Sequence, residues 1–343
     1  MLKVILRFAN LVVLTLLVLS FFSFLLAYMF PGEPLANLTG VVRGNEQQLE
    51  ALGQLYHLDN NFLVQYWYYL AELFDGNWGL SFSSGLPLAS EIARTLPASI
   101  ELSTYALILS MFIGLPLGFI AGLRHRKTTD YALLSLSVLG YSIPVFWLAM
   151  LMILGFCLQL GWFPLSGRLS LLYEVPRISG FILLDIMWSD LENKSAILID
   201  ALRHLILPTL SIAAFTTTII LRITRRSVIE TMNSDYILAA LARGLTPWQI
   251  LFRHGIKNAL MPILPLIALQ FTTLLTNAMI VEVIFSWPGI GNWLIQAIYQ
   301  RDYPAIRVGM LAVSTLVVLF TMSIDLLIRL VDPKKSKVER VAI

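Results

Sequence analysis

The stretch SDYILAALARGLTPWQILFRHGIKNALMP, residues 234–262, decides the fold of this chain, because it is the longest break in hydrophobicity in its second half. Apolar segments lie on both sides of it. A glycine adopts the left-handed conformation that ends a helix at little cost, so we expect a short helix from Asp235 to Arg243 that ends at Gly244. We expect Thr246 to cap a second helix.

The second helix has a proline in its first position and is predicted to extend to about residue 257. It is amphipathic, with apolar Trp248, Ile250, Leu251 and Ile256 beside basic Arg253, His254 and Lys257. This pattern leaves two interpretations open. The helix either rests on a membrane surface or docks on a cytoplasmic partner.

The composition is that of a membrane protein. Of the 343 residues, 57% are hydrophobic and 13% are charged, whereas a soluble domain carries about 25% charged residues. The mean hydropathy is +0.77. Cys157 is the one cysteine, which excludes an intrachain disulfide, and the four histidines lack the spacing of metal ligands.

Six apolar segments are long enough to cross a bilayer, which takes about 20 apolar residues. The first follows Lys3 and Arg7 and is too long for a cleavable signal peptide, so we expect it to remain as a span. The third is long enough to tilt or to lie partly along the membrane surface. The predicted spans are residues 8–30, 99–123, 131–160, 205–223, 263–284 and 308–330.

The distribution of basic residues predicts the orientation. With the N-terminus inside, the cytoplasmic segments hold 16 of the 24 Lys and Arg residues, as the positive-inside rule requires. Arg222, Arg225 and Arg226 are expected to anchor a span at the lipid headgroups. The sequence therefore predicts an all-α integral membrane protein with one membrane domain over residues 1–343. Its non-spanning parts are two extended external segments (31–97 and 161–203), a cytoplasmic loop (234–262) and a cytoplasmic tail (331–343).

The cytoplasmic loop resembles that of the membrane subunits of ATP-binding-cassette (ABC) transporters. In that family an Ala-Ala pair, followed four residues later by Gly, belongs to the coupling helices that contact the ATPase. Here the pattern is Ala239-Ala240 and Gly244, with Leu238 in place of the family's leading Glu. The wider run is similar to the dipeptide/oligopeptide/nickel permease branch. The resemblance implies ATPase coupling by Asp235, Ala239, Ala240, Gly244, Leu245, Thr246, Pro247, Arg253, His254 and Asn258.

Both predicted periplasmic segments carry further runs that are similar to the peptide permeases. GNWGLS at residues 76–81 resembles the N-terminal half of that branch, where such a segment can face the solute-binding protein. A cap that rests on the outer leaflet explains the same segment. LLYEV at residues 171–175 and FSWPGIG at residues 285–291 resemble the Sap-type subgroup, which is linked to antimicrobial peptides and to putrescine.

The fifth span carries a candidate translocation path. Gln270, Thr273 and Asn277 recur at i, i+3 and i+7 and share one helix face, which should point toward protein or water because polar side chains are costly in lipid. Hydrogen bonding between helices explains this face equally well. Glu282 near the outer end is interpreted as a gate charge, a cation contact or a solvated residue.

The sequence lacks the phosphate loop G-x-x-x-x-G-K-[ST], so we expect neither ATP hydrolysis nor a bound cofactor or metal in this chain. The resemblance implies an inner-membrane permease subunit for peptides or small cationic solutes, with both termini cytoplasmic. Its implied partners are a second homologous permease, two ATPase subunits and a periplasmic solute-binding protein. Two alternatives are an exporter of a polyamine such as putrescine and an ATP-independent secondary transporter or channel.

Overall fold

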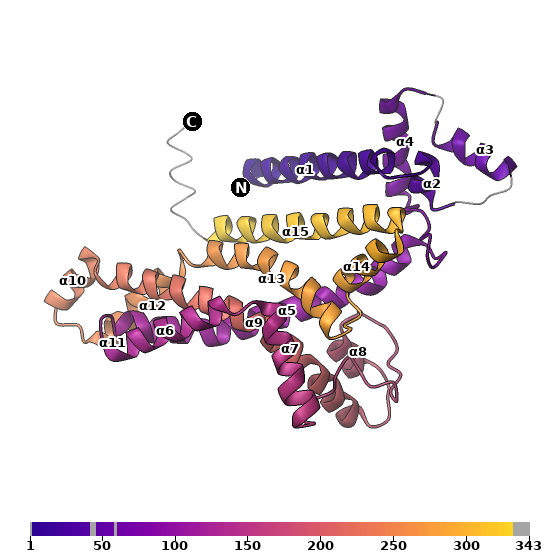
Figure 1. The fold of residues 1–343 in the computed structure, drawn as a ribbon. Coiled ribbons are helices and arrows are strands. Elements are labelled where there is room, and N and C mark those ends of the chain that lie inside the picture. The colour runs from indigo at the N-terminus through magenta and orange to yellow at the C-terminus, as the bar shows by residue number, and fades with distance from the viewer. Residues whose placement is uncertain (1, 42–45, 58–59, 332–343) are drawn as a thin grey trace. The chain divides into compact units, whose positions relative to one another are not determined.

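The computed structural model describes residues 2–41, 46–57 and 60–331, and these residues are mostly helical (Figure 1). Within these ranges no strand forms, and an isolated bridge pairs Leu80 with Pro87. The predicted cytoplasmic tail lies outside the described residues from position 332 onward. The chain folds as two compact units, and α5 and α15 each contribute to both.

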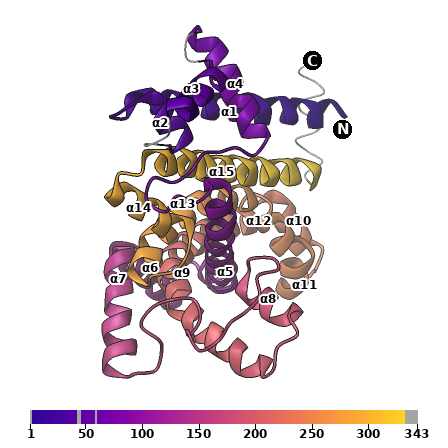
Figure 2. The ribbon, with the colours of Figure 1, turned by 90° about the vertical axis from the view of Figure 1, so that its right-hand side faces the viewer.

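The first unit comprises residues 1–99, 179–181 and 288–322. It contains α1 (Leu2–Met29), α2 (Pro34–Thr39), α3 (Glu46–Leu55), α4 (Phe62–Phe74), the start of α5 (Leu88–Leu123), α14 (Ile290–Gln300) and most of α15 (Tyr303–Val331). Helices α1, α2 and α4 lie together in both views (Figures 1 and 2). Their core is aromatic: the ring of Phe24 on α1 lies 5.3 Å from the ring of Tyr69 on α4, and both are buried.

Two buried polar residues fix α15 within this unit. Arg307 donates hydrogen bonds to the hydroxyl of Tyr69 (2.8 Å) and to the carbonyl of Leu38 (2.9 Å). Asp302, at the start of α15, accepts a hydrogen bond from the backbone N–H of Ala305 (3.1 Å) and another from the Ser81 hydroxyl (2.6 Å). The segment 31–97, for which a cap and a surface for the solute-binding protein were both left open, is therefore joined to α15 by charge-assisted hydrogen bonds.

The second unit comprises residues 100–178, 182–287 and 323–343. It contains the rest of α5, α6 (Thr128–Ser142), α7 (Val145–Met152), the π-helix η1 (Ile153–Gln159), α8 (Ile182–Trp188), α9 (Lys194–Met232), α10 (Asp235–Ala242), α11 (Pro247–Ile250), the π-helix η2 (Leu251–Gly255), α12 (Ile256–Leu260) and α13 (Leu264–Ile284). Helix α9 is at its centre and packs against α6, α7, α8, α12 and α13.

Helices α5 and α9 approach each other closely through a row of glycines on α5. A Cβ atom added at Gly118 would lie 2.5 Å from the Cβ of Thr224 and 2.7 Å from the carbonyl oxygen of Leu221. Gly114 and Gly122, one turn away on either side, face α9 in the same way. Small residues of this kind allow two membrane helices to pack with their backbones almost in contact.

In the described part of the chain, five helices are long and apolar enough to span a membrane: Phe8–Met29, Leu88–Leu123, Lys194–Met232, Leu264–Ile284 and Tyr303–Ile324. The predicted third span, residues 131–160, is not straight, because α6 and α7–η1 meet at a bend of 91°. The bend follows from Pro144, which disfavours helical geometry in the residue before it, and Ile143 is accordingly extended (φ −85°, ψ 118°). The bent pair makes a sixth span only if it crosses the membrane as one element.

The second and fourth predicted spans are parts of longer helices. Helix α5 begins at Leu88 rather than at residue 99, and α9 extends over 39 residues rather than over 205–223. At 1.5 Å per residue α9 is about 58 Å long, which exceeds the apolar thickness of a bilayer of about 30 Å. Hydropathy detects only the apolar part of such a helix, so the polar ends were missed.

Candidate functional site

The segment after α9, which was predicted to be cytoplasmic, is a helical hairpin whose first helix ends in the predicted cap. Gly244 has φ +83°, and its N–H donates to the carbonyl of Leu241 (2.9 Å) while the N–H of Leu245 donates to the carbonyl of Ala240 (3.3 Å). These two bonds satisfy carbonyls at the end of α10 in the Schellman arrangement, in which the glycine takes the left-handed position. The prediction that Gly244 ends the first helix is confirmed.

The second helix begins with a reciprocal pair of side-chain caps. The N–H of Thr246 donates to Oε1 of Gln249 (2.9 Å), and the N–H of Gln249 donates to Oγ1 of Thr246 (3.4 Å). This is the capping-box geometry, and it confirms Thr246 as the cap of α11. The helix predicted to run to about Lys257 is not uniform, because the π-helix η2 interrupts it before α12. Short π-helical turns inside helices occur often at functional sites.

A small apolar core holds the hairpin together. Ile237 and Ala240 of α10 and Ile250 of α11 are buried against one another, with Met232 and Leu245 packed beside them. The two alanines of the Ala-Ala pair therefore differ in burial: Ala240 lies in this core, and Ala239 is exposed.

The outer side of the hairpin exposes large apolar side chains. Leu238 and Leu241 of α10 are 56% and 48% exposed, and Trp248 and Phe252 are 69% and 68% exposed. The rings of Trp248 and Phe252 stack with their centroids 6.0 Å apart. We call these four residues the coupling patch. Of the apolar residues expected in this amphipathic helix, Ile250 is buried and Trp248 is exposed.

The residues expected to couple to the ATPase belong to the same hairpin as the coupling patch. Asp235, Thr246, Arg253 and Asn258 are exposed, whereas Leu245 and His254 are partly buried, and Pro247 is at the start of α11. The structure therefore brings all of the predicted coupling residues into one segment. None of the four residues of the coupling patch was among those expected to couple; the spacing of Trp248 and Phe252 at i and i+4 is the signal that would have indicated a shared face.

The hairpin is attached to the last turns of α9. The hydroxyl of Ser227 on α9 donates to the carbonyl of Ala259 on α12 (2.7 Å). Gly255 of η2 is buried, and a Cβ atom there would lie 3.5 Å from the sulfur of Met232, the last residue of α9. These contacts make the end of α9 the support of the coupling patch.

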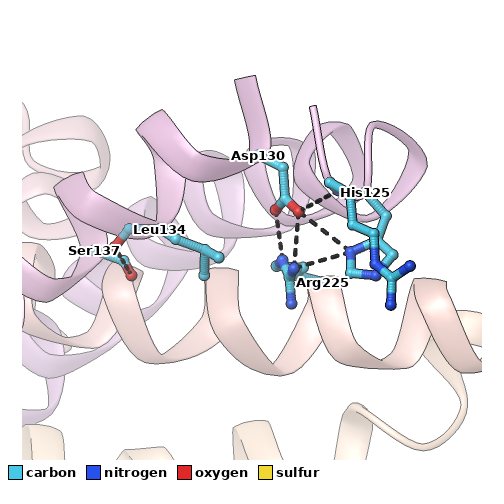
Figure 3. A network of polar contacts seen from close by, with 6 residues as sticks. His125, Asp130, Leu134, Ser137 and Arg225 are labelled. Carbon is cyan, nitrogen blue, oxygen red and sulfur yellow. Dashed lines mark hydrogen bonds and ion pairs between the residues drawn. The ribbon is translucent and has the colours of Figure 1, made fainter. Parts of the chain in front are cut away.

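A second network, which the sequence analysis missed, joins the α5–α6 turn to the same part of α9 (Figure 3). The carboxylate of Asp130 accepts hydrogen bonds from Nε (2.6 Å) and Nη2 (2.8 Å) of Arg225 and from the backbone N–H of Arg126 (2.9 Å). Nδ1 of His125 lies 3.3 Å from this carboxylate and 3.0 Å from Nη2 of Arg225. Arg225 therefore pairs with a buried carboxylate, in contrast to the headgroup anchor that we expected.

The predicted translocation residues lie on α13. Gln270, Thr273 and Asn277 are partly exposed, and Oε1 of Gln270 is buried without a hydrogen-bond partner in the described part of the chain. Glu282 is fully buried, which contradicts its interpretation as a solvated residue. The structure thus leaves the polar face of α13 partly open within the second unit.

Comparisons with known proteins agree with this architecture. The family described as "Binding-protein-dependent transport system inner membrane component" matches residues 114–337, and its N-terminal counterpart matches residues 1–103. The chain is 39% identical over 335 residues to the di/tripeptide transport system permease protein DppB of Pseudomonas aeruginosa (strain UCBPP-PA14), covering 97% of this chain and 98% of that protein. It is likewise 39% identical over 332 residues to the putrescine export system permease protein SapB of Escherichia coli (strain K12), covering 97% of each.

The dipeptide transport system permease protein DppB of Escherichia coli (strain K12) is 35% identical over 340 residues, covering 97% of this chain and 98% of that protein. Among solved structures, a chain of the inward-facing MetNI methionine ABC transporter superposes with a TM-score of 0.53 at 17% identity. This superposition covers 72% of this chain and 98% of that chain, and it supports the fold alone.

The fold and the matched segments define a helical membrane subunit of a transporter. The chain belongs to the family of binding-protein-dependent transport system inner membrane components. It is therefore a multi-pass inner-membrane protein and the permease subunit of an ABC transporter, whose partners include an ATPase and a solute-binding protein. The resemblance to the peptide permeases, Sap-type members included, is confirmed, and the ATP-independent alternative is set aside.

Proposed function

We propose that this subunit and a second, homologous permease together form the path by which an ATP-driven importer moves peptides or small cationic solutes across the inner membrane. The relatives named for di/tripeptide, dipeptide and putrescine transport support this substrate class. Two ATPase subunits and a periplasmic solute-binding protein complete the assembly. Both termini of the chain lie in the cytoplasm, in accordance with its distribution of Lys and Arg residues.

The coupling patch is the surface on which an ATPase subunit docks. The observation that carries this proposal is the group of four large apolar side chains, led by the stacked Trp248 and Phe252, on the exposed side of a doubly capped hairpin. Exposed apolar patches mark sites of protein association. Closure of the ATPase subunits pushes on this hairpin and tilts the helices between inward-open and outward-open states.

The energy comes from the partners. This chain has no nucleotide-binding loop and holds no cofactor of its own, so ATP is bound and hydrolysed by the ATPase subunits. The solute passes along the polar face of α13 formed by Gln270, Thr273 and Asn277, with Glu282 near its outer end. The carbonyl oxygen of Gln270 supports this assignment, because a buried acceptor without a partner is costly unless a ligand or water satisfies it.

Export of a polyamine is the second candidate, and the likeness to the putrescine export permease favours it. The two directions are separable in inverted membrane vesicles that contain the whole complex. An exporter accumulates labelled putrescine inside such vesicles when ATP is added, whereas an importer does not.

A cysteine crosslink tests the docking surface. In a Cys157→Ser background, Thr246→Cys introduces an exposed thiol beside the coupling patch, and Ile237→Cys serves as a control in the buried core of the same hairpin. With a short bifunctional reagent in native membranes, we expect an ATPase adduct at Thr246→Cys whose yield changes with ATP, and none at Ile237→Cys. If Thr246→Cys and cysteines at the other exposed positions of residues 238–252 give no adduct in a folded complex, the hairpin instead rests on the bilayer.

A further inference from the structure

We propose that Asp130 and Arg225 are positioning residues for energy coupling, which link α6 to the coupling patch through the end of α9. This inference rests on the proposed docking of an ATPase on that patch. The pair touches neither the solute nor the ATPase in this assignment. Its role is to transmit a displacement of the hairpin to α6.

The geometry of the pair is that of a rigid connection. The guanidinium of Arg225 contacts both carboxylate oxygens of Asp130, through Nε at 2.6 Å and Nη2 at 2.8 Å. A planar fork that meets a carboxylate in this way fixes orientation as well as distance, which a single point charge does not. The side chain of Asp130 is 1% exposed and that of Arg225 is 19% exposed, so water weakens this pair less than it weakens a surface pair.

The same carboxylate also sets the shape of the α5–α6 turn. It accepts the backbone N–H of Arg126, whose φ of +63° is uncommon for a residue with a side chain. His125 completes the arrangement: with a proton on Nδ1 it donates to Asp130, and without one it accepts from Arg225. Figure 3 shows Asp130 of α6 and His125 of the α5–α6 turn converging on Arg225 of α9.

The end of α9 contacts the hairpin within two turns of Arg225. Ser227 is bonded to Ala259, and Met232 lies against Gly255. From Arg225 to Met232 the helix rises by about 10 Å, so a displacement of the hairpin reaches the ion pair through a short rigid segment. The glycine face of α5 reaches the same place, because a Cβ atom at Gly122 would lie 3.0 Å from the carbonyl oxygen of Arg225.

Helix α6 is held along α9 beyond the ion pair as well. The guanidinium of Arg222 lies 4.6 Å from the ring centroid of Tyr141, and that ring stacks on Phe215 at 5.1 Å. Because α6 leads directly into the 91° bend and α7, a movement of α6 at its inner end carries the bend with it. The pair therefore connects the surface that receives the push to the bent helix pair formed by α6 and α7–η1.

The test measures transport and ATP hydrolysis of the whole complex, reconstituted with its ATPases and binding protein in proteoliposomes. Asp130→Asn removes the charge and keeps the shape, and Arg225→Lys keeps the charge and removes the fork. We expect solute transported per ATP hydrolysed to fall about tenfold in both variants, a loss that corresponds to about 1.4 kcal/mol of coupling free energy. The reversed pair, Asp130→Arg with Arg225→Asp, is expected to regain part of that ratio.

Arg226→Lys is the matched control, because Arg226 is the next residue of α9 and pairs with Glu230 (2.8 Å) on the exposed surface. It should leave the ratio unchanged, since exposed pairs contribute little. A wild-type ratio in both Asp130→Asn and Arg225→Lys would overturn the proposal. So would transport and hydrolysis that fall in equal proportion with the amount of folded complex, because the pair would then be structural only.

The Thr246→Cys crosslink separates this proposal from the proposed function on which it rests. In the Asp130 and Arg225 variants the ATPase adduct should persist, because the docking surface is unchanged. Loss of the adduct from the otherwise unaltered chain would refute the docking surface. Loss of the adduct only in the Asp130 and Arg225 variants would overturn the role assigned to the pair, because the pair would then act by maintaining the structure of the coupling patch.

Discussion

Replacing Gly118 with alanine is expected to push α5 away from α9 and to destabilise the second unit. The added Cβ atom would lie 2.5 Å from the Cβ of Thr224 and 2.7 Å from the carbonyl oxygen of Leu221. Two carbon atoms are in optimal contact at about 3.5–4.0 Å, so the helices would have to separate locally by about 1 Å. Neither neighbouring atom can be moved by rotating a side chain.

The magnitude follows from two opposing effects. Overpacking of a close contact costs about 1–3 kcal/mol, and alanine in place of glycine gains up to about 1 kcal/mol of helix propensity. We therefore expect a net loss of about 1–2 kcal/mol in the free energy of unfolding. For a unit of this size the loss corresponds to a fall of about 2–8 °C in Tm.

Thermal unfolding of the detergent-purified protein, followed by size-exclusion chromatography of heated samples, measures this fall. Gly155→Ala is the matched control, because no atom lies within 4 Å of the position of its Cβ. Its Tm should be unchanged or higher. Gly114→Ala should lie between the two, since its nearest neighbours are less close: Cγ2 and Cβ of Ile220 at 2.9 and 3.0 Å, and the carbonyl oxygen of Thr217 at 3.1 Å. An unchanged Tm in Gly118→Ala would refute the close approach of α5 and α9.

Three further changes test other parts of the molecule. Gly244→Pro should abolish transport in a complex that still reaches the membrane, because proline cannot adopt φ +83° and has no N–H to donate to Leu241; wild-type uptake would exclude the hairpin from coupling. Gln270→Leu should lower transport without lowering Tm, since it removes a buried acceptor that has no partner; a lower Tm with normal transport per folded complex would assign Gln270 to packing. Asp302→Ala should lower Tm, because loss of the N-terminal cap of α15 by itself removes about 1–2 kcal/mol from the free energy of unfolding. An unchanged Tm would show that the cap is dispensable.

The local structure of the hairpin that follows α9 could be predicted from a few neighbouring residues. The left-handed cap at Gly244 and the Thr246 cap depend on backbone preferences that act within five residues, and both were confirmed. The same reasoning could not detect that Trp248 is exposed while Ile250 is buried. That difference depends on how α11 packs against α10 and on the π-turn that follows, and neither is encoded in the helical period alone.

The contacts that build the second unit could not be predicted from the sequence, for a related reason. Asp130 and Arg225 are 95 residues apart in the chain, and a single sequence does not indicate that they meet. Glycines in an apolar segment allow close helix packing in general, but only the fold identifies α9 as the neighbour of α5. Likewise Pro144 interrupts a helix, whereas the angle of 91° at that bend depends on the packing of α7 against α9 and α13.

The sequence by itself determined the all-helical membrane class, the apolar segments, the ends of the coupling helices and the family, because hydropathy, capping and motif spacing are local properties of the chain. Only the tertiary structure decided which side of the hairpin is exposed, which helices touch and which charges pair. The physical reason is that burial and ion pairing depend on distances between segments far apart in sequence, and those distances are fixed only when the whole unit has folded.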